Sequence, residues 1–262
     1  MGYEFDVDTG VSTAGPGRYS AEITDRWHAL SGAPVGGYPF VVALRALADA
    51  VPLPDPLAVS AHFLRPSETG PAEVRAETLR AGRRTATGQA ALSQDGKERL
   101  RLTATFGDLA VAEGRTLLFG EPPALPAPDT LTDLLAASGL TGMSLLDRVE
   151  FRFGDPPGWL SGRPDGEPSC AFWVRFADGR EPDTFALALF WDVMAPVVLD
   201  LGVPISTTLE ATLHVRGRPA PGWVACRVAS RYLTDGLCEE DMEMWDSAGA
   251  LVAQSRQLTL LP

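Results

Sequence analysis

Side chains that commonly carry chemistry are scarce in this chain and do not form a reactive motif. The histidines are His28, His62 and His214, and they occur in neither a His-x-x-x-His nor a His-Glu-x-x-His pattern, so we predict no metal site. The single lysine, Lys97, follows a turn-like Gln-Asp-Gly stretch, which disfavours Schiff-base chemistry. The sequence also lacks a Gly-x-Ser-x-Gly elbow and a Gly-rich phosphate loop with lysine. We therefore expect neither a serine hydrolase of the α/β type nor a bound cofactor.

The cysteines and the apolar runs indicate a cytoplasmic protein without a membrane anchor. The three cysteines, Cys170, Cys226 and Cys238, are odd in number and form no Cys-x-x-Cys pair, which disfavours a disulfide scaffold and a zinc ribbon. The first eight residues are acidic, unlike a signal peptide. The apolar runs are far shorter than the roughly 18 residues of a membrane span.

The charge balance excludes two classes of partner. The 262 residues contain 22 basic and 34 acidic side chains, a net charge of −12. A nucleic-acid binder needs a surface that neutralises phosphates, so we expect no nucleic acid. An anionic membrane surface is disfavoured for the same reason. The length allows one large domain or two small ones.

A proline-rich joint divides the chain into two halves of similar length. Residues 121–129 include four prolines and fit neither a helix interior nor a central strand. We expect an N-terminal half at 1–107, a connector at 108–148 with a short helix near 131–137, and a C-terminal half at 149–262.

Both halves show the same order of predicted elements. The first has strands at 3–7 and 18–23, an apolar helix at 40–51, and strands at 57–64, 72–79, 85–92 and 100–106. The second has strands at 149–153 and 170–176, an apolar helix at 192–201, and strands at 205–215, 223–232, 237–245 and 251–260. The Asp95-Gly96 pair predicts a hairpin turn. This repetition predicts an α+β duplication. We expect a double hotdog, in which two antiparallel sheets each wrap a long apolar helix and join into one continuous sheet.

Several phrases of the sequence support this fold and resemble a known family. In the first half they are His-Phe-Leu-Arg-Pro at 62–66, Leu-Arg-Ala-Gly-Arg at 79–83 and Thr-Ala-Thr-Phe at 103–106. In the second half they are Trp-Asp at 191–192 before Pro-Val-Val-Leu at 196–199, Thr-Thr-Leu-Glu at 207–210, and Gly-Ala-Leu-Val-Ala-Gln-Ser-Arg-Gln at 249–257. With these phrases the chain resembles the double-hotdog acyl-CoA thioesterases of the thioesterase II type.

The resemblance implies hydrolysis of an acyl-CoA thioester by a positioned water, without metal. It places Asp192, Thr208 and Gln257 around that water, with Asp192 as the base. Each residue also has a structural interpretation: Asp is a favoured helix N-cap, and a buried Gln needs hydrogen-bond partners in any case. Strand periodicity does not choose Thr208, because Thr207 shares the apolar face with Leu209.

The resemblance also suggests where substrate binds. Backbone N–H groups at the first helix, beside Gly36, Gly37 and Tyr38, would receive the carbonyl oxygen. Gly36-Gly37 could equally be a turn that leads into the helix. Arg83 and Arg84 could contact the CoA phosphates, although exposed arginines on strands usually only face solvent.

Two other functions stay open at this point. A double-hotdog hydratase or dehydratase would act on enoyl or hydroxyacyl thioesters, although neither predicted helix begins with His. A binding module without catalysis would keep the fold and bind an acyl thioester. The acyl chain type and the formation of a homo-oligomer are not determined by the sequence.

Overall fold

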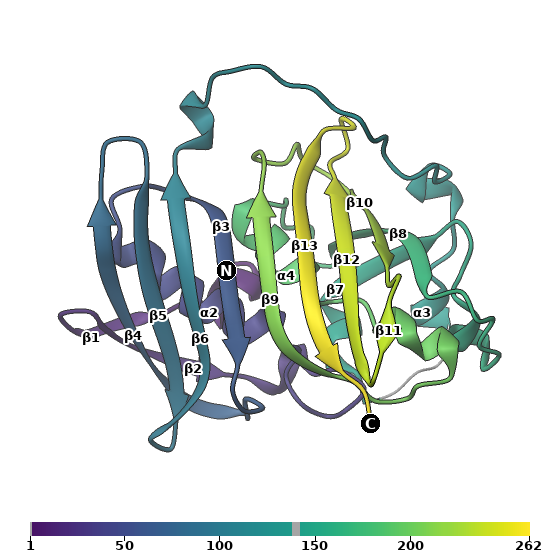
Figure 1. Cartoon of the computed structure of the whole chain (residues 1–262), viewed down its shortest axis with the longest axis horizontal. Coiled ribbons are helices and arrows are strands. Elements are labelled where there is room, and N and C mark those ends of the chain that lie inside the picture. The colour runs from purple at the N-terminus through teal and green to yellow at the C-terminus, as the bar shows by residue number, and fades with distance from the viewer. Residues whose placement is uncertain (1, 138–141) are drawn as a thin grey trace.

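The computed structural model describes residues 2–137 and 142–262, and these residues form one antiparallel sheet of 13 strands with a few helices (Figure 1). The strands are β1 (Ser12–Gly15), β2 (Arg18–Ile23), β3 (Asp55–Phe63), β4 (Gly70–Ala81), β5 (Ala86–Gln94), β6 (Lys97–Gly107), β7 (Val149–Phe153), β8 (Ser169–Phe176), β9 (Thr207–Val215), β10 (Val224–Ala229), β11 (Leu233–Thr234), β12 (Leu237–Trp245) and β13 (Leu251–Leu260). The α-helices are α1 (Glu4–Asp8), α2 (Gly37–Ala50), α3 (Leu134–Ala137) and α4 (Thr184–Phe190). No helix within the described residues is long and apolar enough to cross a membrane.

The two parts of the sheet repeat one strand order and meet at β3 and β9. Read from the outside inward, the order is β1-β2-β4-β5-β6-β3 in the first part and β7-β8-β10-β12-β13-β9 in the second, and β11 pairs with β12 beside this path. β3 and β9 pair antiparallel, from Ala58 opposite His214 to His62 opposite Glu210. The expected continuous sheet is therefore confirmed, and Figure 1 shows α2 and α4 behind it.

The apolar run predicted as a helix at 40–51 forms most of the long helix α2, which begins three residues earlier, at Gly37. Ten of its residues are buried, which is typical of a helix enclosed by a sheet. Pro39 lies in the first turn, where its missing N–H removes no intrahelical hydrogen bond. The helix ends at Ala50, and Val51 has extended backbone angles.

The second helix differs from the prediction, which placed a long helix at 192–201. The helix is the seven-residue α4, and it ends before Asp192. Asp183 is its N-cap and accepts a hydrogen bond from the Ala186 N–H at 2.7 Å. Pro196 explains the error, because proline disfavours helical angles in the residue before it and lacks a donor. After it, Val197–Leu201 forms only a 3₁₀ turn.

The N-terminal segment 3–7 was also predicted wrongly. It forms the helix α1 instead of a strand, with acidic residues in its first turn, where they favour the helix dipole. The other predicted strands match the structure to within a few residues. The predicted short helix of the connector matches α3, although residues 138–141 of the connector lie outside the described residues.

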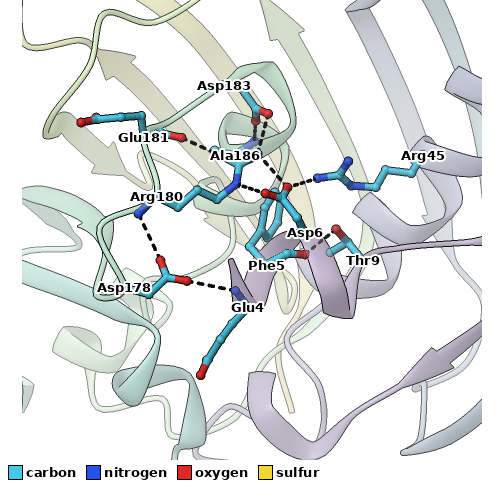
Figure 2. Close-up of polar contacts among 10 residues, drawn as sticks. All are labelled: Glu4, Phe5, Asp6, Thr9, Arg45, Asp178, Arg180, Glu181, Asp183 and Ala186. Carbon is cyan, nitrogen blue, oxygen red and sulfur yellow. Dashed lines mark hydrogen bonds and ion pairs between the residues drawn. The ribbon is translucent and has the colours of Figure 1, made fainter. Parts of the chain in front are cut away.

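A charged cluster ties α1 to Arg45, inside α2, and to the start of α4 (Figure 2). The guanidinium of Arg180 donates to both carboxylate oxygens of Asp6, at 3.0 and 2.9 Å, and to Asp183 at 2.6 Å. Arg45 of α2 donates to Asp6 at 2.8 Å. Burial raises the pKa of Asp6, but the hydrogen bonds and charges of the two arginines outweigh it and hold the pKa below its ordinary value. Because Asp183 caps α4, this cluster fixes the position of that helix.

Candidate active site

Asp192 follows α4 and reaches the start of the other core helix. Its Oδ2 accepts a hydrogen bond from the Gly37 N–H at 2.7 Å. Trp191, the residue before it, is buried, with ring centroids 5.6 Å from Phe40 and 6.1 Å from Phe63. The structural interpretation of the sequence made Asp192 the N-cap of a following helix. Asp192 is not such a cap, because α4 ends before it and the next 3₁₀ turn begins only after Pro196. It provides a carboxylate to the N-terminus of α2, where backbone N–H groups favour negative charge.

The two glycines before and at the start of α2 leave room for this carboxylate. A Cβ atom on Gly37 would lie 2.9 Å from the Leu189 carbonyl oxygen and 3.1 Å from Asp192 Cβ. A Cβ on Gly36 would lie 3.0 Å from a ring carbon of Phe63 and 3.1 Å from Asp192 Oδ2. Glycine is thus needed here for close approach. The Gly37 N–H, expected to face a substrate oxygen, donates to Asp192 in this structure.

Tyr38 lies beside these glycines but points its side chain elsewhere. Its ring is fully buried, and its hydroxyl forms hydrogen bonds with the backbone of Asp8, Glu22 and Thr24. The Tyr38 phenol therefore holds α2 against the N-terminal segment.

Arg83 and Arg84 do not lie with Asp192. Both are exposed in the turn between β4 and β5. Near this end of β4, Thr78 donates to the carbonyl of Ala50, the last residue of α2. Asp192 lies at the opposite end of that helix, whose 14 residues rise roughly 20 Å at about 1.5 Å each.

Thr208, Gln257 and Glu240 form a chain of hydrogen bonds across three neighbouring strands. The Thr208 hydroxyl donates to Gln257 Oε1 at 2.7 Å, and Gln257 Nε2 donates to Glu240 Oε1 at 2.7 Å. The other oxygen of Glu240 accepts from the Val197 N–H at 3.0 Å. Gln257 and Glu240 are 6% and 8% exposed. A buried amide and a buried carboxyl thus have partners on each side.

A β-bulge between β9 and β13 determines which of the adjacent Thr207 and Thr208 faces Gln257. Glu210 pairs with Leu258, and Thr208 pairs with Thr259, so Leu209 has no partner of its own on β13. The extra residue reverses the alternation of side chains, because a bulge re-aims the residues beyond it. Thr208 therefore contacts Gln257 on the inner face, and Thr207 is exposed. Regular alternation had grouped Thr207 with the apolar face.

Asp192 interacts electrostatically with Glu240, the last member of the Thr208–Gln257–Glu240 hydrogen-bond chain. Burial raises the pKa of Asp192 to about 7, the Gly37 and Gly36 N–H groups oppose the rise, and the charge of Glu240 adds to it. Burial also raises the pKa of Glu240, against hydrogen bonds from Val197 and Gln257. Asp192 keeps partial exposure. An accessible carboxyl that titrates near neutral pH is suited to general-base chemistry.

The first part of the sheet contains a matching bulge. Leu57 of β3 has no partner of its own on β6, as Leu209 has none on β13. Both bulges lie at the third residue of a nine-residue strand, counted from Asp55 and from Thr207. The two parts of the sheet can therefore be aligned residue by residue.

This alignment places small or apolar residues where the second part has polar ones. Pro56, Ala104 and Gly88 correspond to Thr208, Gln257 and Glu240, respectively. A Cβ on Gly88 would lie 2.6 Å from Leu47 Cδ1 of α2. In the first part the long helix covers these positions. In the second part α4 is short, and the polar chain lies beyond its end.

Glu240 was not predicted from the sequence. The signal that could have found it is its place in β12, where the residues at 238, 240, 242 and 244 are all buried. They are Cys, Glu, Met and Met, so Glu240 is a charged side chain on an otherwise apolar face. Such a residue is almost never fully buried without partners.

Comparisons with known proteins agree with the fold. The family model of the acyl-CoA thioesterase C-terminal domain matches residues 121–261, and that of the N-terminal domain matches residues 23–107. A proposed thioesterase II of Thermobifida fusca is 30% identical, with a TM-score of 0.88 over 99% of this chain and 98% of that one. A hot dog fold protein of unknown function from Alicyclobacillus acidocaldarius is 22% identical, with a TM-score of 0.89 over 100% and 99% of the two chains. An uncharacterised Mycobacterium tuberculosis protein is 26% identical over 80% of this chain and 78% of its own length. The chain belongs to the acyl-CoA thioesterase family.

Proposed function

We propose that this protein hydrolyses an acyl-CoA thioester to a free carboxylic acid and CoA at the site around Asp192. The observation that carries the proposal is the Asp192 carboxyl, held at the α2 N-terminus and coupled to the Thr208–Gln257–Glu240 chain. In this proposal 1–107 and 149–262 are the two halves of a double hotdog, and 108–148 is their connector. A cytoplasmic location and a homo-oligomer stay predictions.

Asp192 is the general base in this mechanism. Its Oδ2 accepts from Gly37, so Oδ1 is the oxygen that takes a proton from the attacking water. With a pKa of about 7, the carboxyl is substantially ionised at neutral pH and a stronger base than an exposed aspartate.

Thr208 and Gln257 orient the water. The Thr208 hydroxyl gives its only proton to Gln257, so toward the water its oxygen acts as an acceptor. Gln257 Nε2 uses one proton for Glu240, and its second proton is available for the water oxygen or the substrate carbonyl. With one water proton on Asp192 and the other on Thr208, a water lone pair is left to attack.

The reaction then proceeds through a tetrahedral intermediate. The water oxygen bonds to the thioester carbonyl carbon, and Asp192 receives the proton. The carbonyl oxygen gains negative charge, which the second Nε2 proton of Gln257 stabilises. The C–S bond breaks as the carbonyl re-forms, and protonated Asp192 returns the proton to the CoA sulfur.

The test measures free thiol released from saturated acyl-CoAs of increasing chain length. The wild type should release thiol at an unchanged rate in EDTA. Asp192→Asn should lower turnover by about 10²–10⁴, the usual effect of losing a general base. Asp241→Asn is the matched control, because Asp241 pairs with Arg256 away from the site; it should keep its activity.

Two outcomes would replace the proposal. Hydration of crotonyl-CoA, with saturated acyl-CoAs left intact, would indicate a hydratase. Binding of several acyl-CoAs without turnover of any would indicate a binding module. Full turnover by Asp192→Asn would instead remove Asp192 from the reaction.

A further inference from the structure

Glu240 is a buried carboxyl whose two hydrogen-bond partners are both N–H donors. It lies on the inner face of β12, 8% exposed, with no arginine or lysine bonded to it within the described residues. Both of its oxygens accept N–H groups, one from Gln257 Nε2 and one from the Val197 backbone. Neither contact asks Glu240 to donate a proton, so the ionised form satisfies both donors.

The direction of the hydrogen bonds depends on this carboxylate. A carboxamide has a donor end and an acceptor end. Because both oxygens of Glu240 act as acceptors, the Nε2 end of Gln257 faces Glu240, and the Oε1 end faces Thr208. Because Gln257 Oε1 can only accept, the Thr208 hydroxyl must be the donor in this hydrogen bond. This leaves the Thr208 oxygen as an acceptor toward the site.

We infer that Glu240 is a positioning residue, which sets the orientation of the Gln257 carboxamide and, through it, the acceptor role of Thr208 toward the attacking water. The inference rests on the proposed function for its catalytic meaning. The hydrogen-bond chain and the coupling to Asp192 can be measured without substrate.

Charge gives Glu240 a second effect, on the base itself. The titratable groups that interact with Glu240 are Asp192, from the turn after α4, and Cys238 on its own strand. Facing Asp192 are Glu240 and the uncharged N–H groups of Gly36 and Gly37 at the start of α2. The negative charge of Glu240 raises the pKa of Asp192. Glu240 therefore raises the pKa of the proposed base, Asp192, and also orients the carboxamide of Gln257.

Glu240→Gln is the decisive variant, because it keeps the shape of the side chain and removes its charge. The new amide must present a donor to Gln257 or to Val197, which forces Gln257 to turn over or leaves two donors facing each other. We expect kcat to fall by about 10- to 100-fold, as for other displacements of catalytic groups, with KM within about twofold of the wild type. The acid limb of the pH–rate profile should move to lower pH.

Two further variants separate the effects of shape and charge. Glu240→Asp keeps the charge and shortens the side chain, so it should lower kcat through the lost Gln257 contact and keep the acid limb nearer its wild-type position. Glu243→Gln is the matched control, because Glu243 lies on the same strand and pairs with Arg227 on the outer face. It should leave kcat and the pH profile unchanged. An unchanged kcat and acid limb in Glu240→Gln would overturn the inference.

A measurement without substrate separates this inference from the proposed function. The Asp192 carboxyl is titrated by ¹³C NMR in the wild type, in Glu240→Gln and in Glu240→Asp, and Glu240→Ala, which also removes the charge, replaces Glu240→Gln if that variant does not fold. The pKa of Asp192 should fall in Glu240→Gln and stay closer to the wild-type value in Glu240→Asp. If the wild type releases no thiol but this fall occurs, the proposed function fails and the coupling stands. An unchanged Asp192 titration in folded Glu240→Gln would overturn the inference whatever the activity.

Discussion

Replacing Asp192 by Asn should make the folded protein more stable at neutral pH while it abolishes most of the proposed activity. The substitution keeps an oxygen that accepts from Gly37, so the contact at the start of α2 survives. What it removes is a carboxyl that has to ionise in a poorly solvated place. The folded structure raises the pKa of this group to about 7 from an ordinary value of 3.8.

The sign follows from proton linkage. A folded pKa above the unfolded value means that the folded state binds the proton more tightly. The stability that this proton gives is fully present below pH 3.8 and is lost as the pH rises to about 7. A gap of about 3 pKa units, at about 1.4 kcal/mol each, amounts to about 4 kcal/mol. Asn does not titrate, so the variant escapes this loss.

The assay is urea unfolding of the wild type and Asp192→Asn at pH 5 and pH 8. The free energy of unfolding of Asp192→Asn, relative to the wild type, should increase by about 2.5 kcal/mol between these two pH values. Asp241→Asn, which changes an aspartate paired with Arg256, should show no such increase. The quantity compared is the free energy of unfolding of Asp192→Asn minus that of the wild type. If this difference is the same at both pH values, or smaller at pH 8 than at pH 5, the assignment of a raised pKa to Asp192 is refuted.

The remaining predictions concern the residues that build the site. Thr208→Val should lower kcat by about 10- to 100-fold and Thr207→Val should change it little, because the bulge turns only Thr208 toward Gln257; equal losses would contradict the bulge argument. Gly37→Ala should lower the free energy of unfolding by about 1–3 kcal/mol, because its Cβ would lie 2.9 Å from a backbone oxygen, and thermal unfolding would measure this. Arg180→Gln should lower the free energy of unfolding by about 2 kcal/mol, because charge-assisted hydrogen bonds are lost. Urea unfolding at one fixed pH measures this loss, and a variant as stable as the wild type would mean that the cluster contributes nothing.

Elements with a strong local signal could be predicted from the sequence. The helix α2 is apolar on nearly all sides, so its burial follows from composition. The hairpin between β5 and β6 follows from Asp95-Gly96, since both residues adopt positive φ and this pair tolerates it. The repeated order of elements predicted one continuous sheet, because a strand edge left open would need a partner.

Elements with a competing local signal could not be predicted. The run at 192–201 is apolar enough for a buried helix, yet Pro196 breaks it, and the helical residues lie before Asp192. The segment 3–7 alternates like a strand, but Phe5 is buried as part of a helix that packs on the second half, with its ring 4.9 Å from that of Phe176. Periodicity describes local geometry only, and here tertiary contacts decided the conformation.

The sequence by itself determined the types of residue at the candidate site, through their resemblance to a family. Only the tertiary structure decided which of them meet. It placed Asp192 against Gly37, 155 positions away along the chain, and it left Arg83 and Arg84 exposed in the turn between β4 and β5. It selected Thr208 through a bulge whose pairing partner lies on another strand. Local sequence cannot encode such pairings by its periodicity, because register is set by the packing of whole strands.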